Sequence, residues 1–501
     1  MIGFLIIGIL VLIGVIAVQI GKVTDLAGQI RGEEEVERRS NDRSAVWMLI
    51  FMVVFLVFCI ASAWYYKDSM LGYGPHQSAS EHGGTLDSLF NVTLFFTGIV
   101  FVITHILTFW YAYKYRDQPG RKATFFSHSN KLEIIWTALP AVVMTILVVQ
   151  GLIAWNDIMY DVEPGEDFIE IEATGYQFAW DIRYPGADGK LGTKDFRLIK
   201  PGVNDLGQDW TDEKNIDDFK ATDIVLPVNK KVRVRITAKD VLHNFYLPHF
   251  RVKMDAIPGL PTYFVFTPTV TTEEYRNKIK DYPEYQVPYD EDEPDGPQRW
   301  EMFEYELACA ELCGKGHYSM RKVVKIVSEA EYEAWLKQQQ SYYLTNIRNT
   351  DEDPFKGTLL PIEAKQRAEE LGAEVQKVIS ENDFESSIRL TNLFFETGSA
   401  TLKDDSKYEL DNIAEILNKN GGVTIEISGH TDSTGDAGSN QILSSERARN
   451  VVTYLADKGI DSNRLSDVGY GQNRPADTNE TAEGRQNNRR IEMRITSNNN
   501  L

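Results

Sequence analysis

Residues 309–320 read CAELCGKGHYSM, and this stretch decides how the rest of the chain is interpreted. It places Cys309 and Cys313 four residues apart and follows them with His317 and Met320. Thiolate, imidazole and thioether groups are soft or borderline ligands that suit copper, whereas calcium and magnesium prefer oxygen. Copper held by Cys, His and a weak Met is typical of electron-transfer sites, so the stretch predicts a site of that kind.

One further His is needed if two metal ions are to be bound symmetrically. His243 is the best candidate, because it follows a strand-like run at 232–237, and His249 is a rival six residues later. Two other interpretations of the cysteine pair stay open on the residues alone, a disulfide bond and a structural zinc site. The C-x-x-C-H motif that attaches a c-type haem does not occur in the sequence.

The stretches 240–259 (DVLHNFYLPHFRVKMDAIPG) and 309–320 together resemble the dinuclear copper (CuA) domain of cytochrome c oxidase subunit II. In that family the ligand precedes an aromatic-x-x-Pro sequence, which selects His243 over His249. The resemblance implies that two thiolates bridge two copper ions, and that the Glu311 side chain faces a magnesium ion shared with subunit I. The implied copper ligands are His243, Cys309, the backbone carbonyl of Glu311, Cys313, His317 and Met320.

Length and charge bound the possible partners. A chain of 501 residues is expected to form several domains, and a net charge of −21 makes nucleic acid an unsuitable partner. An acidic surface suits a basic protein such as a small cytochrome c. The resemblance implies oxidase subunits I and III as neighbours, and as donor a cytochrome c or a cytochrome c domain of a respiratory complex.

Four apolar runs are each long enough to cross about 30 Å of hydrocarbon. They are residues 2–20, 45–66, 88–113 and 134–155. The first has no basic start and no small-residue cleavage site, so we expect it to be retained. The loops after the first and third runs are basic, which predicts that both lie in the cytoplasm. The chain is then a multi-pass protein of the bacterial inner membrane, with everything after residue 155 in the periplasm.

The fourth run carries a further resemblance. Residues 131–143 (KLEIIWTALPAVV) resemble the membrane hairpin of subunit II through the pattern E-x-x-W-T-x-x-P. A carboxylate at a membrane edge is costly unless it meets water or has a function. The resemblance implies that Glu133 lies at the mouth of a proton channel into subunit I. The first two runs are additional to that hairpin.

Short alternating strands follow from residue 167 to 327 and predict an antiparallel β-sandwich, which by resemblance is a cupredoxin. Within 175–186 (GYQFAWDIRYPG), Phe178 stands where the family usually has the tryptophan through which electrons enter. Trp180 remains and is a possible substitute. The acidic, tyrosine-rich stretch 271–300 is expected to be a solvated loop.

The C-terminal part alternates strand and helix. Its motifs GHTDSTG, LSSERA, VGYGQNRP and GRQNNRRIE resemble the OmpA-like peptidoglycan-binding domain, an α+β fold. The resemblance implies that Asp432 and Arg447 clamp the ammonium and carboxylate of diaminopimelate in the wall peptide.

The sequence therefore predicts a four-span helical membrane part, an all-β cupredoxin-like sandwich and an α+β OmpA-like domain. The expected parts are two extra spans (1–66), a loop and membrane hairpin (67–160), a CuA domain (161–327), a helical linker (328–384) and a wall-binding domain (385–501). The function implied is that of subunit II of a haem–copper oxidase, one subunit of a multi-subunit oxidoreductase, held to peptidoglycan. The alternative is a cell-envelope tether whose metal site is vestigial or holds zinc.

Overall fold

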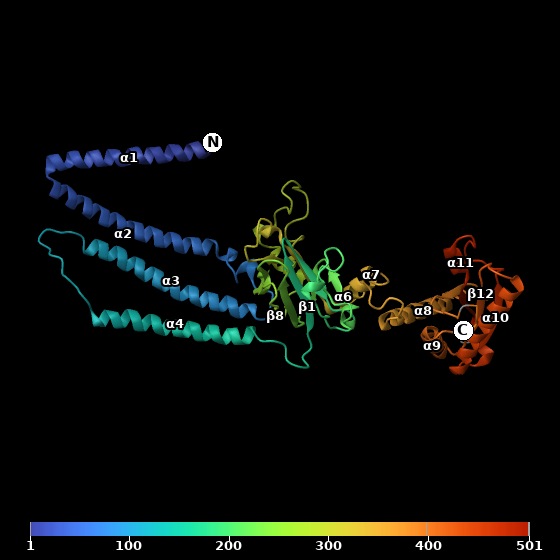
Figure 1. The fold of residues 1–501 in the computed structure, drawn as a ribbon. Coiled ribbons are helices and arrows are strands. Elements are labelled where there is room, and N and C mark those ends of the chain that lie inside the picture. The colour runs from blue at the N-terminus through green and yellow to red at the C-terminus, as the bar shows by residue number, and fades with distance from the viewer. Residues whose placement is uncertain (1, 397, 499–501) are drawn as a thin grey trace. The chain divides into compact units, whose positions relative to one another are not determined.

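Four long apolar helices precede the β-rich part of the chain (Figure 1). The structure, a computed structural model, describes residues 2–396 and 398–498. Each helix is long and apolar enough to cross a membrane, which agrees with the four predicted spans. Their bounds are α1 (Ile2–Arg31), α2 (Glu33–Tyr65), α3 (Gly83–Lys114) and α4 (Asn130–Ile158).

The helix α2 begins well before its apolar run. Its 33 residues reach about 50 Å at 1.5 Å per residue, against about 30 Å of hydrocarbon. Its first three turns are charged, and Asp42 there accepts a 2.6 Å hydrogen bond from Arg116 at the end of α3. Phe51 of α2 meets Phe109 of α3 edge to face, so the second of the additional helices packs along the hairpin helix.

Two five-stranded sheets form the sandwich that follows α4. The first has the order β3-β2-β1-β5-β8 and the second the order β4-β10-β9-β6-β7. The first sheet contains β1 (Ile169–Tyr176), β2 (Ala179–Tyr184), β3 (Phe219–Ala221), β5 (Val232–Ala238) and β8 (Thr262–Phe266). The second contains β4 (Ile224–Pro227), β6 (His243–Leu247), β7 (Val252–Ala256), β9 (Tyr305–Cys309) and β10 (Lys322–Val327).

The strands form where apolar residues alternate along the sequence. In β5, the side chains of Val232, Val234 and Ile236 are buried between the sheets and the intervening arginines face outward. The expectation of purely antiparallel sheets was wrong. The pairs β1–β5 and β4–β10 are parallel, because each joins segments far apart in the sequence that no hairpin connects.

An ion pair fastens the sandwich to the start of α3. Arg251, which precedes β7, donates to both carboxylate oxygens of Asp87 in α3, at 2.7 and 3.0 Å. Its remaining hydrogen bonds go to the carbonyls of His76 and Pro248. Backbone hydrogen bonds on either side of Ser80 add to this contact, so the loop before α3 is part of the sandwich surface.

The stretch 271–300 is not simply a solvated loop. It contains the helix α5 (Thr272–Ile279), which begins with a capping box between Thr271 and Glu274. The side chains of Tyr275 and Ile279 are buried in the core of the sandwich. The expectation failed because two apolar residues four apart anchor this segment as a helix.

The part between the two predicted domains is helical and divided. Tyr332 of α6 (Glu329–Leu336) packs against the sandwich, and α7 (Tyr342–Asn346) ends the first compact unit. The second compact unit begins at Ile347. Its first helix, α8 (Pro361–Glu381), buries Leu371, Val375 and Val378 in the core of that unit.

The second unit is a four-stranded sheet with the order β11-β14-β12-β13 and helices packed on it. This confirms the mixed α and β character predicted for the C-terminal part. Its remaining elements are β11 (Ser387–Leu390), α9 (Lys407–Lys419), β12 (Val423–His430), α10 (Ala437–Asp457), β13 (Leu465–Gly471), α11 (Ala482–Asn488) and β14 (Ile491–Asn498).

Candidate metal centre

The predicted ligands come from neighbouring strand ends of the second sheet. His243 is the first residue of β6 and Cys309 is the last of β9, and these strands pair antiparallel. The loop after β9 carries Cys313, then a short 3₁₀ turn at His317–Ser319, then Met320 before β10. A rigid pair of strands therefore holds two ligands, and a short loop brings the others to them.

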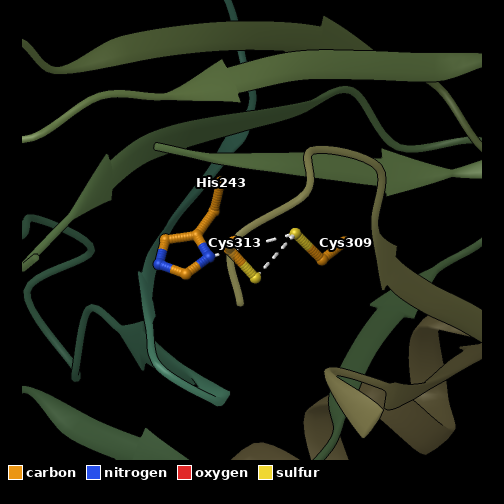
Figure 2. Close-up of side chains that lie close together, drawn as sticks. All are labelled: His243, Cys309 and Cys313. Carbon is orange, nitrogen blue, oxygen red and sulfur yellow. Dashed lines mark hydrogen bonds between the residues drawn. The ribbon is translucent and has the colours of Figure 1, made fainter. Parts of the chain in front are cut away.

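The sulfur and nitrogen atoms converge on one small volume. The two thiol sulfurs are 3.9 Å apart, and Nδ1 of His243 is 3.9 Å from Cys309 Sγ. Figure 2 shows these three side chains pointing toward one another. On the other side, Nδ1 of His317 and Sδ of Met320 are 3.6 and 3.3 Å from Cys313 Sγ. Each histidine thus approaches a different sulfur.

These distances fit metal ions between the ligands and not a disulfide bond. The sulfurs of a disulfide lie about 2.05 Å apart, and both cysteines are free in the structure. A metal ion bound to thiolate sulfur at about 2.3 Å and imidazole nitrogen at about 2.0 Å needs separations below about 4.6 Å between sulfurs and about 4.3 Å between sulfur and nitrogen. The observed 3.9, 3.9 and 3.6 Å satisfy both limits.

The electrostatics of the thiols also call for a cation. Burial raises the pKa of Cys313 to about 11, and the neighbouring Cys309 adds to the effect. Two adjacent thiolates in a buried position repel each other, so positive charge between them is needed for both to ionise. A soft metal cation would provide such charge.

The other two predicted ligands, the Glu311 carbonyl and Met320, also lie close to the cysteine sulfurs. The backbone carbonyl of Glu311 is 3.2 Å from Cys309 Sγ, while the Glu311 side chain is exposed. Met320 is buried, with 1% of its surface exposed. The rival His249 lies elsewhere, with its ring edge-on to Tyr275 and Phe303. Burial there lowers the pKa of His249 to about 4.

The two aromatic residues of the predicted electron route have different surroundings. Trp180 is only 2% exposed and packs edge-on against His243, so it cannot touch a partner protein directly. Phe178 is exposed (37%) and lies over the ligand loop, where a Cβ added at Gly316 would lie 2.5 Å from its ring. Trp180 is therefore not a surface contact for a donor, because its ring is inside the sandwich, and its part in electron entry stays a prediction.

Two residues that the sequence interpretation missed complete the surroundings of the site. Asp240 Oδ1 is 2.9 Å from Nε2 of His243, and Gln177 donates its backbone N–H to Asp240 and its side-chain N–H to the carbonyl of Cys313. The spacing of three residues between Asp240 and His243 is a signal that could have suggested the first contact. No local signal could have revealed Gln177, because its partners are 63 and 136 residues away.

Glu133 stands apart from the metal centre. It lies in the first turn of α4, where its side chain is exposed. A carboxylate in the first turn is favoured by the helix dipole.

The two residues predicted to bind peptidoglycan lie in the second unit. Asp432 is buried and accepts hydrogen bonds from the Thr434 N–H and from Arg489. Arg447 stacks 4.8 Å over the ring of Phe395 and donates to the Ser399 carbonyl. Among the described residues, no hydrogen bond or ion pair joins Asp432 to Arg447. The sequence interpretation missed Arg489 as a partner of Asp432, although Arg489 is the first arginine of the NNRR motif at 487–490.

A cavity of about 120 Å³ opens beside these residues. Four arginines line it, with His430 and aromatic side chains between them. Burial, and then the positive charge of Arg489, lower the pKa of Arg447, because both disfavour its charged form. The lining arginines are Arg389, Arg447, Arg489 and Arg490. Such a cavity suits an anionic group.

Comparison with known proteins agrees with both parts of this description. Alternative cytochrome c oxidase subunit 2 of Bradyrhizobium diazoefficiens is 30% identical over 307 residues, which are 61% of this chain and 95% of that protein. The chain belongs to the cytochrome c oxidase subunit II family. Family models for the subunit II transmembrane domain and periplasmic domain match residues 69–153 and 169–272, and the OmpA family matches residues 394–489.

Two further matches each cover a separate part of the chain. Outer membrane protein A of Bordetella avium is 42% identical over 102 residues, 20% of this chain, and the match spans about half (53%) of that protein. The solved periplasmic domain of subunit II of cytochrome oxidase from Bradyrhizobium japonicum is 26% identical and covers 34% of this chain and 93% of its own, with a TM-score of 0.21. The resemblances to subunit II and to OmpA are both confirmed.

Proposed function

We propose that this subunit II chain accepts single electrons from a cytochrome c at a dinuclear copper centre and passes them to haem in subunit I, where oxygen is reduced and protons are pumped. The donor is a soluble cytochrome c or a cytochrome c domain of a respiratory complex. The observation that carries the proposal is the pair of free thiols 3.9 Å apart, each approached by a different histidine nitrogen.

The residues of this site suit rapid electron transfer. When bound, the copper pair supplies a reversible one-electron couple. Cys313 and Met320 are buried, and His243 and Cys309 are fixed by paired strands, so few groups can move when the charge changes. The Glu311 side chain, exposed beside the site, is the proposed contact to a magnesium ion shared with subunit I.

The donor's contact surface must lie where a ligand reaches solvent. His317 is half-buried, and its neighbours Leu312 and Tyr318 are 81% and 83% exposed. Phe178 borders the same loop. We place the contact of the donor haem on these apolar side chains, with Trp180 behind them as an internal ring against His243.

The membrane part supplies the connection to protons. The orientation is proposed from the basic loops, which face the cytoplasm in membrane proteins. It puts Glu133 at the cytoplasmic edge of α4, at the mouth of a proton channel into subunit I. The metal centre and the second unit then lie in the periplasm of a bacterium, beside subunits I and III in the inner membrane.

The second unit is proposed to hold the complex to peptidoglycan. Asp432 would accept hydrogen bonds from the ammonium of diaminopimelate, and Arg447 would donate hydrogen bonds to its carboxylate. Because Asp432 already accepts from Arg489, the ammonium must share or displace that contact. The cationic cavity that Arg447 lines supports the carboxylate half of the clamp.

Copper loading of the purified full-length protein tests the metal centre. We expect two copper ions per chain, a purple colour, and an electron paramagnetic resonance signal whose hyperfine pattern is shared by two nuclei. Cys309→Ser should abolish that signal. Cys59→Ser is the matched control, because Cys59 is the chain's third cysteine and lies on α2. This change should leave the signal intact. A colourless protein that binds one zinc ion would refute the proposal and favour the alternative, an envelope tether.

Sedimentation with purified peptidoglycan tests the anchor. Asp432→Ala and Arg447→Ala should each release the protein from the wall fraction. Arg449→Ala, on the exposed side of the same helix, is the control and should bind like the wild type. Equal binding by all four proteins would refute the clamp.

A further inference from the structure

The hydrogen bond on the far side of His243 decides which nitrogen faces the thiol. Asp240 Oδ1 lies 2.9 Å from Nε2 of His243. A carboxylate can only accept, so Nε2 must carry the hydrogen and Nδ1 keeps its lone pair. Nδ1 is the nitrogen that lies 3.9 Å from Cys309 Sγ. Asp240 thus selects the tautomer that can bind a metal ion at the thiols.

Gln177 joins this contact to the opposite half of the site. Its backbone N–H donates to Asp240 Oδ2 at 2.8 Å, and its side-chain Nε2 donates to the carbonyl of Cys313. The other oxygen, Asp240 Oδ1, also accepts from the Val241 N–H at 2.7 Å. One residue therefore connects the His243 side of the centre to the backbone of the Cys313 side.

Packing leaves the His243 ring little freedom apart from this bond. Its side chain is fully buried, Trp180 meets it edge-on, and a Cβ added at Gly175 would lie 3.1 Å from the ring carbon Cδ2. The ring plane is fixed by these contacts, but packing alone does not distinguish the two nitrogens. Asp240 makes that distinction.

We propose that Asp240 and Gln177 are positioning residues of the metal centre. Asp240 sets the tautomer of His243, and Gln177 keeps Asp240 and the Cys313 loop at a fixed separation. The inference rests on the proposed function, because it assigns these residues to the same site. Loss of such a partner behind a metal-binding histidine lowers metal affinity by about 10- to 100-fold.

Metal titration of the purified full-length protein tests the proposal with two probes, copper and cobalt(II). Asp240→Ala and Asp240→Asn should each weaken the affinity for both metals by about 10- to 100-fold, and they should change the copper hyperfine pattern. Gln177→Glu keeps the size of the side chain but removes its N–H donor, so it should shift that pattern with a smaller loss of affinity. Asp223→Asn is the matched control: Asp223 is 30% exposed and hydrogen-bonded to Lys325, whereas Asp240 is 34% exposed.

The outcomes separate this inference from the proposed function. Wild type that binds cobalt(II) through thiolates but forms no mixed-valence copper pair would overturn the electron-transfer function, while the cobalt(II) affinities of the variants still decide the role of Asp240. Affinities within twofold of wild type, with an unchanged copper signal, would overturn the inference. A variant that merely unfolds more easily, while its loaded signal is unaltered, would also overturn it, because that is the result of a purely structural role.

Discussion

The ion pair between Arg251 and Asp87 should hold the copper-binding sandwich on the membrane hairpin. Asp87→Ala is the perturbation. It removes two charge-assisted hydrogen bonds and leaves Arg251, which is 7% exposed, with only the carbonyls of His76 and Pro248. Removing one partner of a buried pair costs about 3–5 kcal/mol. Because the remaining carbonyls still accept from Arg251, we expect the lower end, about 3 kcal/mol.

The loss should appear as local opening and not as global unfolding. The amide N–H groups of Ala79, Glu81 and Thr269 make hydrogen bonds across this contact. Hydrogen exchange at these amides in the full-length protein is the assay. A loss of about 3 kcal/mol corresponds to exchange about a hundredfold faster, since about 1.4 kcal/mol is a factor of ten.

A second ion pair, between Asp42 of α2 and Arg116 just beyond α3, provides the control. It makes one short contact and Asp42 is 48% exposed, so Asp42→Ala should have little effect on exchange. The double variant Arg251→Met with Asp87→Ala should recover much of the protection, because no unpaired charge is left buried. Exchange in Asp87→Ala that is no faster than in wild type would refute the reasoning, as would a double variant as poor as the single one.

Three further changes test other parts of the chain. Met320→Leu should retain both copper ions, cost less than about 1.5 kcal/mol, and raise the reduction potential, because a weak axial donor is lost; potentiometry measures this. Gly316→Ala should lower the free energy of unfolding of the sandwich by about 1–3 kcal/mol, as measured by denaturation, since the new methyl group would lie 2.5 Å from Phe178. Glu492 has a pKa lowered to about 2, chiefly by the His430 side chain, whose Nε2 lies 3.6 Å from its carboxylate, so the second unit should lose up to about 3 kcal/mol as the pH falls from about 4.5 toward 2. Exchange of the β12 and β14 amides measures it, and Glu492→Gln should flatten the dependence.

Each of these has a result that would contradict it. Loss of copper from Met320→Leu would show that the thioether is needed for binding and not only for tuning. Wild-type stability in Gly316→Ala would mean that the Phe178 ring moves away freely. An acid profile that is unaltered in Glu492→Gln would assign the acid sensitivity of the unit to other carboxylates.

The parts of the site that could be predicted are those whose members lie close together in the sequence. Cys309, Cys313, His317 and Met320 fall within one loop, so their spacing already shows that they can meet. His243 required the resemblance, because it comes from another strand. The four spans were evident from length and apolar composition alone, which are the only properties that a membrane demands of a helix.

What could not be predicted depends on contacts between distant segments. The burial of Trp180 and the hydrogen bonds of Gln177 follow from how β1, β2 and the ligand loop come together, and no local pattern contains that information. The parallel strand pairs are missed for the same reason. The helix α5 is different, since Thr271 and Glu274 form a capping box in the sequence that predicts its start.

The close approach of Phe178 to the ligand loop has an evolutionary consequence. Gly314 and Gly316 have no room for a side chain beneath that ring, and the predicted ligands Cys313 and His317 flank them. The neighbouring positions Leu312 and Tyr318 point into solvent. Fixed and free positions thus alternate along one short loop. On the proposed function, substitutions at the outward positions would let lineages exchange one electron donor for another, while the ligands beneath are kept.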